Sequence, residues 1–162
     1  MKMMSMSLNY SVSYMMITGF LTNYFIMSNV MTNDVANITN NLSKIYISLV
    51  MAFIMGILEV LMYDMHNQSV SLKYYIPLFL FFGLSLWLYR KQIAVNEANY
   101  LREMIEHHDM ALFTSKNLLD KPLISPKVRD FAKKIVNTQT KEIDEMKQLI
   151  QQHDTNTNNN TN

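Results

Sequence analysis

Charged side chains are distributed very unevenly along this chain, and this asymmetry limits its possible folds more than any other feature. Of its 14 basic and 13 acidic residues, only six lie within residues 1–89, and the other 21 lie within residues 90–162. Only 17% of the chain is charged, whereas a typical soluble domain carries about 25%. A single soluble domain would spread its charges along the sequence. We therefore expect a membrane-embedded first half and a water-facing second half.

Three segments of the first half are candidates for membrane spans, since a helix needs about 20 apolar residues to cross a bilayer. Residues 45–63 are the most apolar and carry one charge, Glu59. Residues 74–89 are uncharged and are flanked by tyrosine and tryptophan, which favour the membrane interface. Residues 10–31 are also uncharged but contain Thr, Asn and Ser. The sequence predicts an all-α fold with about three transmembrane helices in residues 1–89.

Glu59 and the methionines of the first half each have two interpretations. An acid inside a span is a functional candidate by default, but Glu59 lies near Asp64 and can instead reach the interface. Twelve of the 15 methionines belong to this half. They include Met51 and Met55, which could form a track for soft metal ions. Methionine is equally an ordinary lipid-compatible residue.

The second half predicts a helical hairpin over residues 90–152. Residues 78–119 contain no proline and one glycine, so we expect the third span to continue unbroken as a helix into water. Ser125 and Pro126 then indicate the N-cap and first residue of a second helix. Apolar residues recur at helical spacing on both helices, which predicts antiparallel packing. Residues 153–162 are mostly Asn and Thr and are predicted to form a disordered tail.

Polar and sulfur-containing side chains interrupt the two facing apolar stripes of this hairpin. Folding the chain about residue 123 places His108 opposite Gln139 and Met104 opposite Glu142, with Met146 close by. Such polar groups cost free energy unless they are paired or bind a metal. Imidazole and thioether groups together favour copper, above all Cu(I), and a carboxylate widens the choice. Alternatively, His108 is a core histidine that is hydrogen-bonded to Gln139 or Glu142.

His107 has a different expected position from His108, because adjacent residues on a helix point about 100° apart. His107 can share a helical turn with Met104, or it can face a second copy of the hairpin. It can also simply be exposed. The candidate metal ligands are Met104, His107, His108, Glu142 and Met146, with Gln139 as a polar neighbour.

The run Met104-Ile105-Glu106-His107-His108 resembles the Met-Ile-Pro-His-His signature of the domain-of-unknown-function family 305 (DUF 305). Ser125–Arg129, with the Gln139, Glu142 and Met146 that follow, resembles the second helix of that family. The match covers about residues 96–151, and the apolar first half resembles the membrane-anchored branch. This chain has Glu106 in place of the family's proline and Thr114 where many soluble members have methionine.

The resemblance implies a ferritin-like helical bundle and, from some members, copper binding and copper tolerance. It implies that His107, His108, Met104 and Met146 are metal ligands. It also implies that the hairpin of the anchored branch faces away from the cytoplasm.

These observations predict a non-enzymatic, multi-pass integral membrane protein that lies in a lipid bilayer and displays a His/Met hairpin, with copper as its expected ligand. A helical hairpin alone buries little surface, so we expect a homo-oligomer that forms through it. The alternative is a structural or assembly protein whose hairpin mediates oligomerisation. The chain has no cysteine and a net charge of +1, which excludes thiolate chemistry and gives no basic field for nucleic acid. The Glu-x-x-His spacing of di-iron enzymes is also absent.

Overall fold

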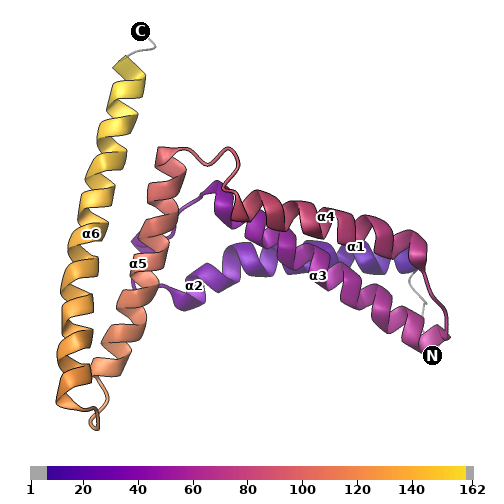
Figure 1. Cartoon of the computed structure of the whole chain (residues 1–162), viewed down its shortest axis with the longest axis horizontal. Coiled ribbons are helices and arrows are strands. Elements are labelled where there is room, and N and C mark those ends of the chain that lie inside the picture. Colours follow the sequence, from indigo (N-terminus) through magenta and orange to yellow (C-terminus); the bar gives the residue numbers. More distant parts are fainter. Residues whose placement is uncertain (1–6, 160–162) are drawn as a thin grey trace. The chain divides into compact units, whose positions relative to one another are not determined.

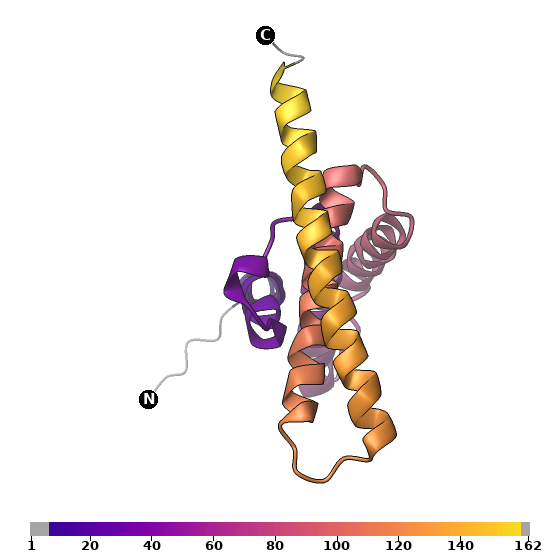
Figure 2. The same ribbon diagram turned by 90° about the vertical axis from the view of Figure 1, so that its left-hand side faces the viewer.

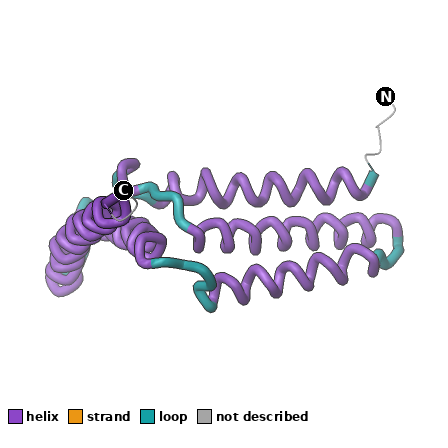
Figure 3. The backbone as a smooth tube through the Cα atoms, turned by 90° about the horizontal axis from the view of Figure 1, so that it is seen from above, coloured by secondary structure: helices purple, strands orange, loops and turns teal. Residues whose placement is uncertain are grey.

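The computed structural model describes residues 7–159, and these form helices joined by short loops, with no strand among them (Figure 3). The described chain divides into two compact units. The first contains the residues up to Met27 together with Ser43–Ala94, and the second contains Ser28–Leu42 together with the chain from Val95 onward. The predicted all-α class is therefore confirmed.

The first unit consists of three helices that run side by side in Figure 1. They are α1 (Leu8–Leu21), α3 (Leu42–Asn67) and α4 (Leu72–Arg90). A π-helical turn, η1 (Thr22–Met27), extends α1. Val12, Val60 and Leu78, one from each helix, form the buried centre of this unit. The apolar sequence of the first half thus produces a bundle whose remaining large hydrophobic side chains are mostly exposed.

The helices α3 and α4 are both long and apolar enough to cross a membrane. They include the predicted spans 45–63 and 74–89. The third predicted span, residues 10–31, is helical but divided into α1, η1 and α2 (Ser28–Met31). Only two of the three predicted spans therefore meet the criterion as single helices.

Interhelical contacts show that α1 packs antiparallel to α3. Ser11 donates a hydrogen bond to Glu59, and near the other end Asn23 donates one to Ser48 over 3.0 Å. Between these contacts, a Cβ added to Gly19 would lie 2.7 Å from Cγ of Met55. Residues near the start of α1 therefore meet the end of α3, and η1 meets its beginning. Glu59 thus bonds to a neighbouring helix, which neither of its two interpretations from the sequence included.

The second unit contains the antiparallel hairpin of α5 (Glu97–Leu119) and α6 (Pro126–Asn159), which lie side by side in Figures 1 and 2. Ile105, Leu112, Ile143 and Met146 form its buried core. Ser125 accepts a hydrogen bond from the Val128 amide, as expected for the N-cap of α6. The predicted hairpin and its turn are confirmed.

Two boundaries differ from the predictions. The helix α4 does not continue into α5, because Gln92 and Ala94 adopt φ angles of 49° and 58° and break the helix. The Asn96 side chain then accepts a hydrogen bond from the Asn99 amide and caps α5. The prediction of a disordered tail over residues 153–162 is also wrong in part, because α6 continues to Asn159. No proline or glycine follows Pro126 to end that helix, and the last three residues of the predicted tail lie outside the described chain.

The second unit also contains residues 32–42, which we call the strap. The short helices α2 and η2 (Val35–Asn37) lie before and within it. Both pack against α5. The hairpin helix α5 thus has neighbours on two sides, α6 and the strap.

Candidate functional site

Helical periodicity directs four consecutive residues of α5 to different surroundings. Each residue turns the side chain by about 100°. His108 points towards α6, and His107 has a side chain that is 54% exposed. Asp109 and Glu106 contact the strap. Within one helical turn, the side chains of Glu106–Asp109 therefore contact α6, the solvent and the strap.

His108 is hydrogen-bonded at both ring nitrogens. Its Nδ1 lies 2.7 Å from the Met104 carbonyl oxygen, and its Nε2 lies 2.9 Å from Oε2 of Glu142. A carbonyl oxygen can only accept, so Nδ1 carries hydrogen. The bond to Glu142 then needs one more proton, either on the ring or on the carboxyl group. This contact therefore joins an imidazole of α5 to a carboxyl group of α6.

The partner of His108 lies about one turn further along α6 than the predicted Gln139. The loop between α5 and α6 is centred close to the predicted fold point. However, helical side chains tilt towards the N-terminus of their own helix. In an antiparallel pair, His108 tilts away from the loop and Glu142 tilts towards it, so the two meet. Gln139 is half-buried, and His108 makes no hydrogen bond to it in the described chain.

The two methionines belong to the apolar core of the same helix interface. Met146 is 8% exposed, and Met104 packs against the same cluster. His107 lies apart from them, and its Nε2 is 3.7 Å from Oε1 of Glu103 on the same helix. The structure therefore places Met104, His108, Glu142 and Met146 along the α5–α6 interface and leaves His107 outside it.

The donor groups at this interface decide which metal ion could fit. Within residues 7–159, no three His, Asp or Glu side chains are grouped to hold one. The interface contains one imidazole, one carboxylate and two thioethers, and these donor types suit soft copper better than zinc or calcium. The Nδ1 hydrogen bond to a backbone carbonyl also matches the way in which metal-binding histidines are usually oriented. The donor types fit copper, but the carboxylates and imidazoles are too few to hold a metal ion without the two thioethers.

Asp109 is the main functional candidate that the sequence did not predict. Its side chain is fully buried at 0% exposure. Its Oδ2 accepts hydrogen bonds from Thr32 Oγ1, from the Asn33 amide at 2.6 Å and from the Asp34 amide at 3.0 Å. Its Oδ1 accepts from Asn37 Nδ2 at 2.6 Å. Burial opposes ionisation, but these four hydrogen bonds outweigh it and hold the pKa of Asp109 below its usual value.

A second set of hydrogen bonds continues this contact along α5. Glu106 Oε1 accepts from the Thr39 amide at 2.6 Å, and the Thr39 hydroxyl donates to the Arg102 carbonyl at 2.9 Å. Asn99 accepts from the Leu42 amide at 3.3 Å. These partners are about 57 to 77 residues apart in sequence, so no local pattern could have paired them. The Asn- and Thr-rich composition of the strap was the only available signal.

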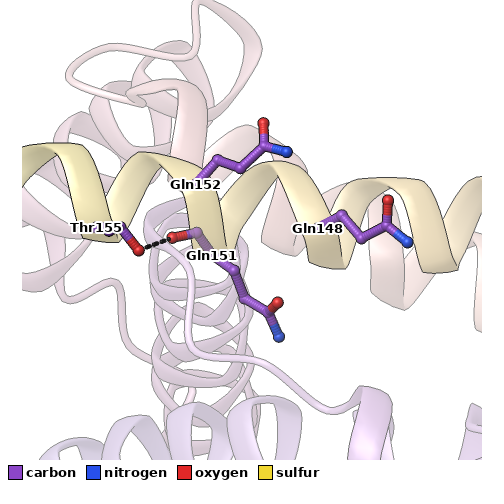
Figure 4. Close-up of a pocket in the computed structure, with 4 residues that line it drawn as sticks. All are labelled: Gln148, Gln151, Gln152 and Thr155. Carbon is purple, nitrogen blue, oxygen red and sulfur yellow. Dashed lines mark hydrogen bonds between the residues drawn. The ribbon is translucent and has the colours of Figure 1, made fainter.

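One further surface feature lies near the end of α6. Gln148, Gln151, Gln152 and Thr155 line an open depression, shown in Figure 4. The Thr155 hydroxyl donates to the Gln151 carbonyl at 2.8 Å. Only amide and hydroxyl groups line this depression, so it offers no group for acid–base or strong metal chemistry.

The fold and the site together define an all-α protein with an apolar helical bundle and a hairpin that contains a partly buried histidine–carboxylate pair. Residues 97–162 match the model of the family described as "Domain of unknown function (DUF305)". This match contains the His-His motif from which the family was predicted. Neither the curated proteins nor the solved structures contain a significant match to the chain.

Proposed function

We propose that this chain is a non-enzymatic, multi-pass membrane protein whose DUF305 hairpin binds a copper ion. The apolar helices α3 and α4 support membrane insertion. The contacts between α1 and α3 support a third span, because α1 with η1 follows α3 from Glu59 to Ser48. Close packing at Gly19 and at Gly56, where an added Cβ would lie 2.9 Å from Met16 Cγ, is typical of membrane helices.

Copper is proposed because of one observation: His108 faces Glu142 across the α5–α6 interface, to which Met104 and Met146 also contribute. The Met104 carbonyl holds Nδ1, so Nε2 is the nitrogen that would bind the ion. Met104 and Met146 would supply thioether ligands, and Glu142 would supply a carboxylate or accept the displaced proton. When bound, the copper ion would be held by soft ligands at the helix interface, which is suited to storage or transfer.

A copper titration of the full chain in lipid nanodiscs tests this proposal. We expect Cu(I) binding that competes with a colorimetric chelator and that is lost in His108→Ala. His66→Ala is the matched control, because His66 is an exposed histidine at the end of α3. Equal binding by wild type, His108→Ala and His66→Ala would contradict the assignment, as would no binding by wild type. His107→Ala then measures whether the exposed histidine takes part.

The second candidate function is assembly through the hairpin, and exposed apolar side chains favour it. On α6, Phe131 is 64% exposed, Val128 is 47% exposed and Leu149 is 45% exposed. Pairing with a second copy would cover these side chains and form a ferritin-like four-helix bundle. It would also bring a second His108–Glu142 pair towards the first if the copies met on this face.

Analytical ultracentrifugation in detergent distinguishes the two candidates. If the hairpin mediates assembly, Phe131→Asp shifts the chain from dimer to monomer, and a copper chelator does not. Lys133→Asp is the control, because it introduces the same side chain at an exposed polar position of α6. A dimer that depends on copper would instead favour the first candidate.

We also propose that the hairpin faces away from the cytoplasm, as the family resemblance implies. Three spans would place the two ends of the chain on opposite sides. Protease digestion of sealed vesicles tests this, because a hairpin inside the vesicle lumen is protected until detergent is added.

A further inference from the structure

The strap and α6 contact different sides of α5, and the residues that hold the strap form one stripe. Asn99, Arg102, Glu106 and Asp109 are separated by three, four and three residues. This spacing keeps them on one face of a helix. The strap runs antiparallel to α5, since Leu42 meets Asn99 and residues 32–37 meet Asp109. One side of α5 is thus polar and bonded, and the other is apolar and packed on α6.

Asp109 is the centre of this polar contact. Four hydrogen bonds from the strap converge on its two oxygens, and two of them come from backbone amides that cannot turn away. Hydrogen bonds to an ionised carboxylate are shorter and stronger than those between neutral groups. The apolar contacts with α6 are less directional than hydrogen bonds, so they restrict the rotation of α5 about its axis less narrowly than the bonds to Asp109 can.

His108 directly precedes Asp109, so any rotation of α5 moves both side chains. We propose that Asp109 is a positioning residue: by binding the strap, it sets the rotation of α5 and so directs Nε2 of His108 at Glu142. The strap is then a built-in clamp of the DUF305 hairpin. This inference rests on the proposed copper site for its functional meaning, but the His108–Glu142 geometry can be tested without copper.

The experiment compares Asp109 variants of the full chain in nanodiscs. Asp109→Leu keeps the branching at Cγ and the number of non-hydrogen atoms but removes both acceptors, whereas Asp109→Asn restores one. Asp130→Asn, at an exposed position of α6, is the matched control. Because Asp109→Leu could disturb folding, the double variant Thr32→Ala/Asn37→Ala removes two donors from the strap and leaves α5 unchanged. Helix content by circular dichroism verifies that each variant folds.

Three readouts distinguish positioning from simple support. Hydrogen exchange of residues 32–39 reports strap release, and ¹⁵N NMR of the His108 ring reports its bond to Glu142. Copper titration reports affinity, for which loss of an outer partner typically costs about ten-fold or more. We expect Asp109→Leu and the double variant to release the strap, shift the His108 ring signals and weaken copper binding. Asp109→Asn should restore most of each, and Asp130→Asn should resemble wild type.

Released strap with unchanged His108 ring signals would overturn the inference, and so would a strap that stays protected in Asp109→Leu. A wild-type chain that binds no copper would contradict the proposed function instead. In that case the ¹⁵N signals alone decide whether Asp109 positions His108.

Discussion

The buried contact of Asp109 with the strap predicts how stability depends on the residue at position 109. In Asp109→Asn, the single carbonyl oxygen can face the three donors that now bind Oδ2. The new amide group would then face Nδ2 of Asn37, which is also a donor. However, Oδ1 of Asn37 is buried and has no partner within the described chain. We expect the Asn37 amide to turn over and accept the new hydrogen bond.

The size of the effect follows from the type of each bond. A hydrogen bond to a charged group contributes about 1.5–3 kcal/mol and a neutral one about 0.5–1.5 kcal/mol. Asp109→Asn converts charged bonds to neutral ones, but the neutral amide costs less to bury, so we expect a net loss of about 1–2 kcal/mol. Asp109→Leu leaves four donors unpaired at about 1–3 kcal/mol each. The summed cost of these unpaired donors should exceed the free energy that holds the strap on α5, so the strap should detach.

Hydrogen exchange of the Asn33 and Asp34 amides measures these differences, because local opening sets their exchange rates. A loss of 1–2 kcal/mol corresponds to roughly ten-fold faster exchange. In Asp109→Leu, these two amides should exchange as fast as those of an open loop. Adding Asn37→Ala to Asp109→Asn should cost less than the sum of the two changes, because in the double variant Asn37→Ala removes a neutral hydrogen bond, whereas in the wild type it removes a stronger bond to a carboxylate. Strictly additive effects, or a protected strap in Asp109→Leu, would refute this reasoning.

The other predictions concern acid, helix packing and metal uptake. The pKa of Asp109 in the folded chain is lowered from 3.8, so its contribution to stability is complete above that pH and is lost as the pH falls through the lower folded value. Exchange of the strap amides, corrected for the intrinsic rate, should therefore be steady from pH 5 to 7. It should accelerate in stronger acid. Gly19→Ala should destabilise the bundle by about 1–3 kcal/mol through overpacking against Met55, whereas Gly83→Ala, which meets nothing within 4 Å, should not; thermal unfolding in detergent compares them. Copper uptake at His108 should release about one proton per ion in weakly buffered solution, and uptake by wild type without proton release would contradict binding at the hydrogen-bonded His108–Glu142 pair.

Local patterns in the sequence were enough to predict most of the helices, although not all of their ends, and one side of the candidate site. The apolar runs predicted α3 and α4, and Ser125-Pro126 predicted the start of α6, because capping and hydrophobic spacing act within a few residues. The same spacing placed His108 and Glu142 on facing stripes. It could not choose between Gln139 and Glu142 as the partner, because side-chain tilt shifts the contact by about one turn.

Long-range contacts were decided only by the tertiary structure. Nothing next to Asp109 in the sequence identifies it as a buried acceptor, because all four of its donors come from residues 32–37. The bond from Ser11 to Glu59 is of the same kind, since it joins two helices that are distant in sequence. The uneven distribution of charge along the sequence was thus enough to predict an apolar helical first half and a polar second half. Burial and long-range hydrogen bonding decided which charged side chains, such as Asp109 and Glu59, hold two segments of the chain together.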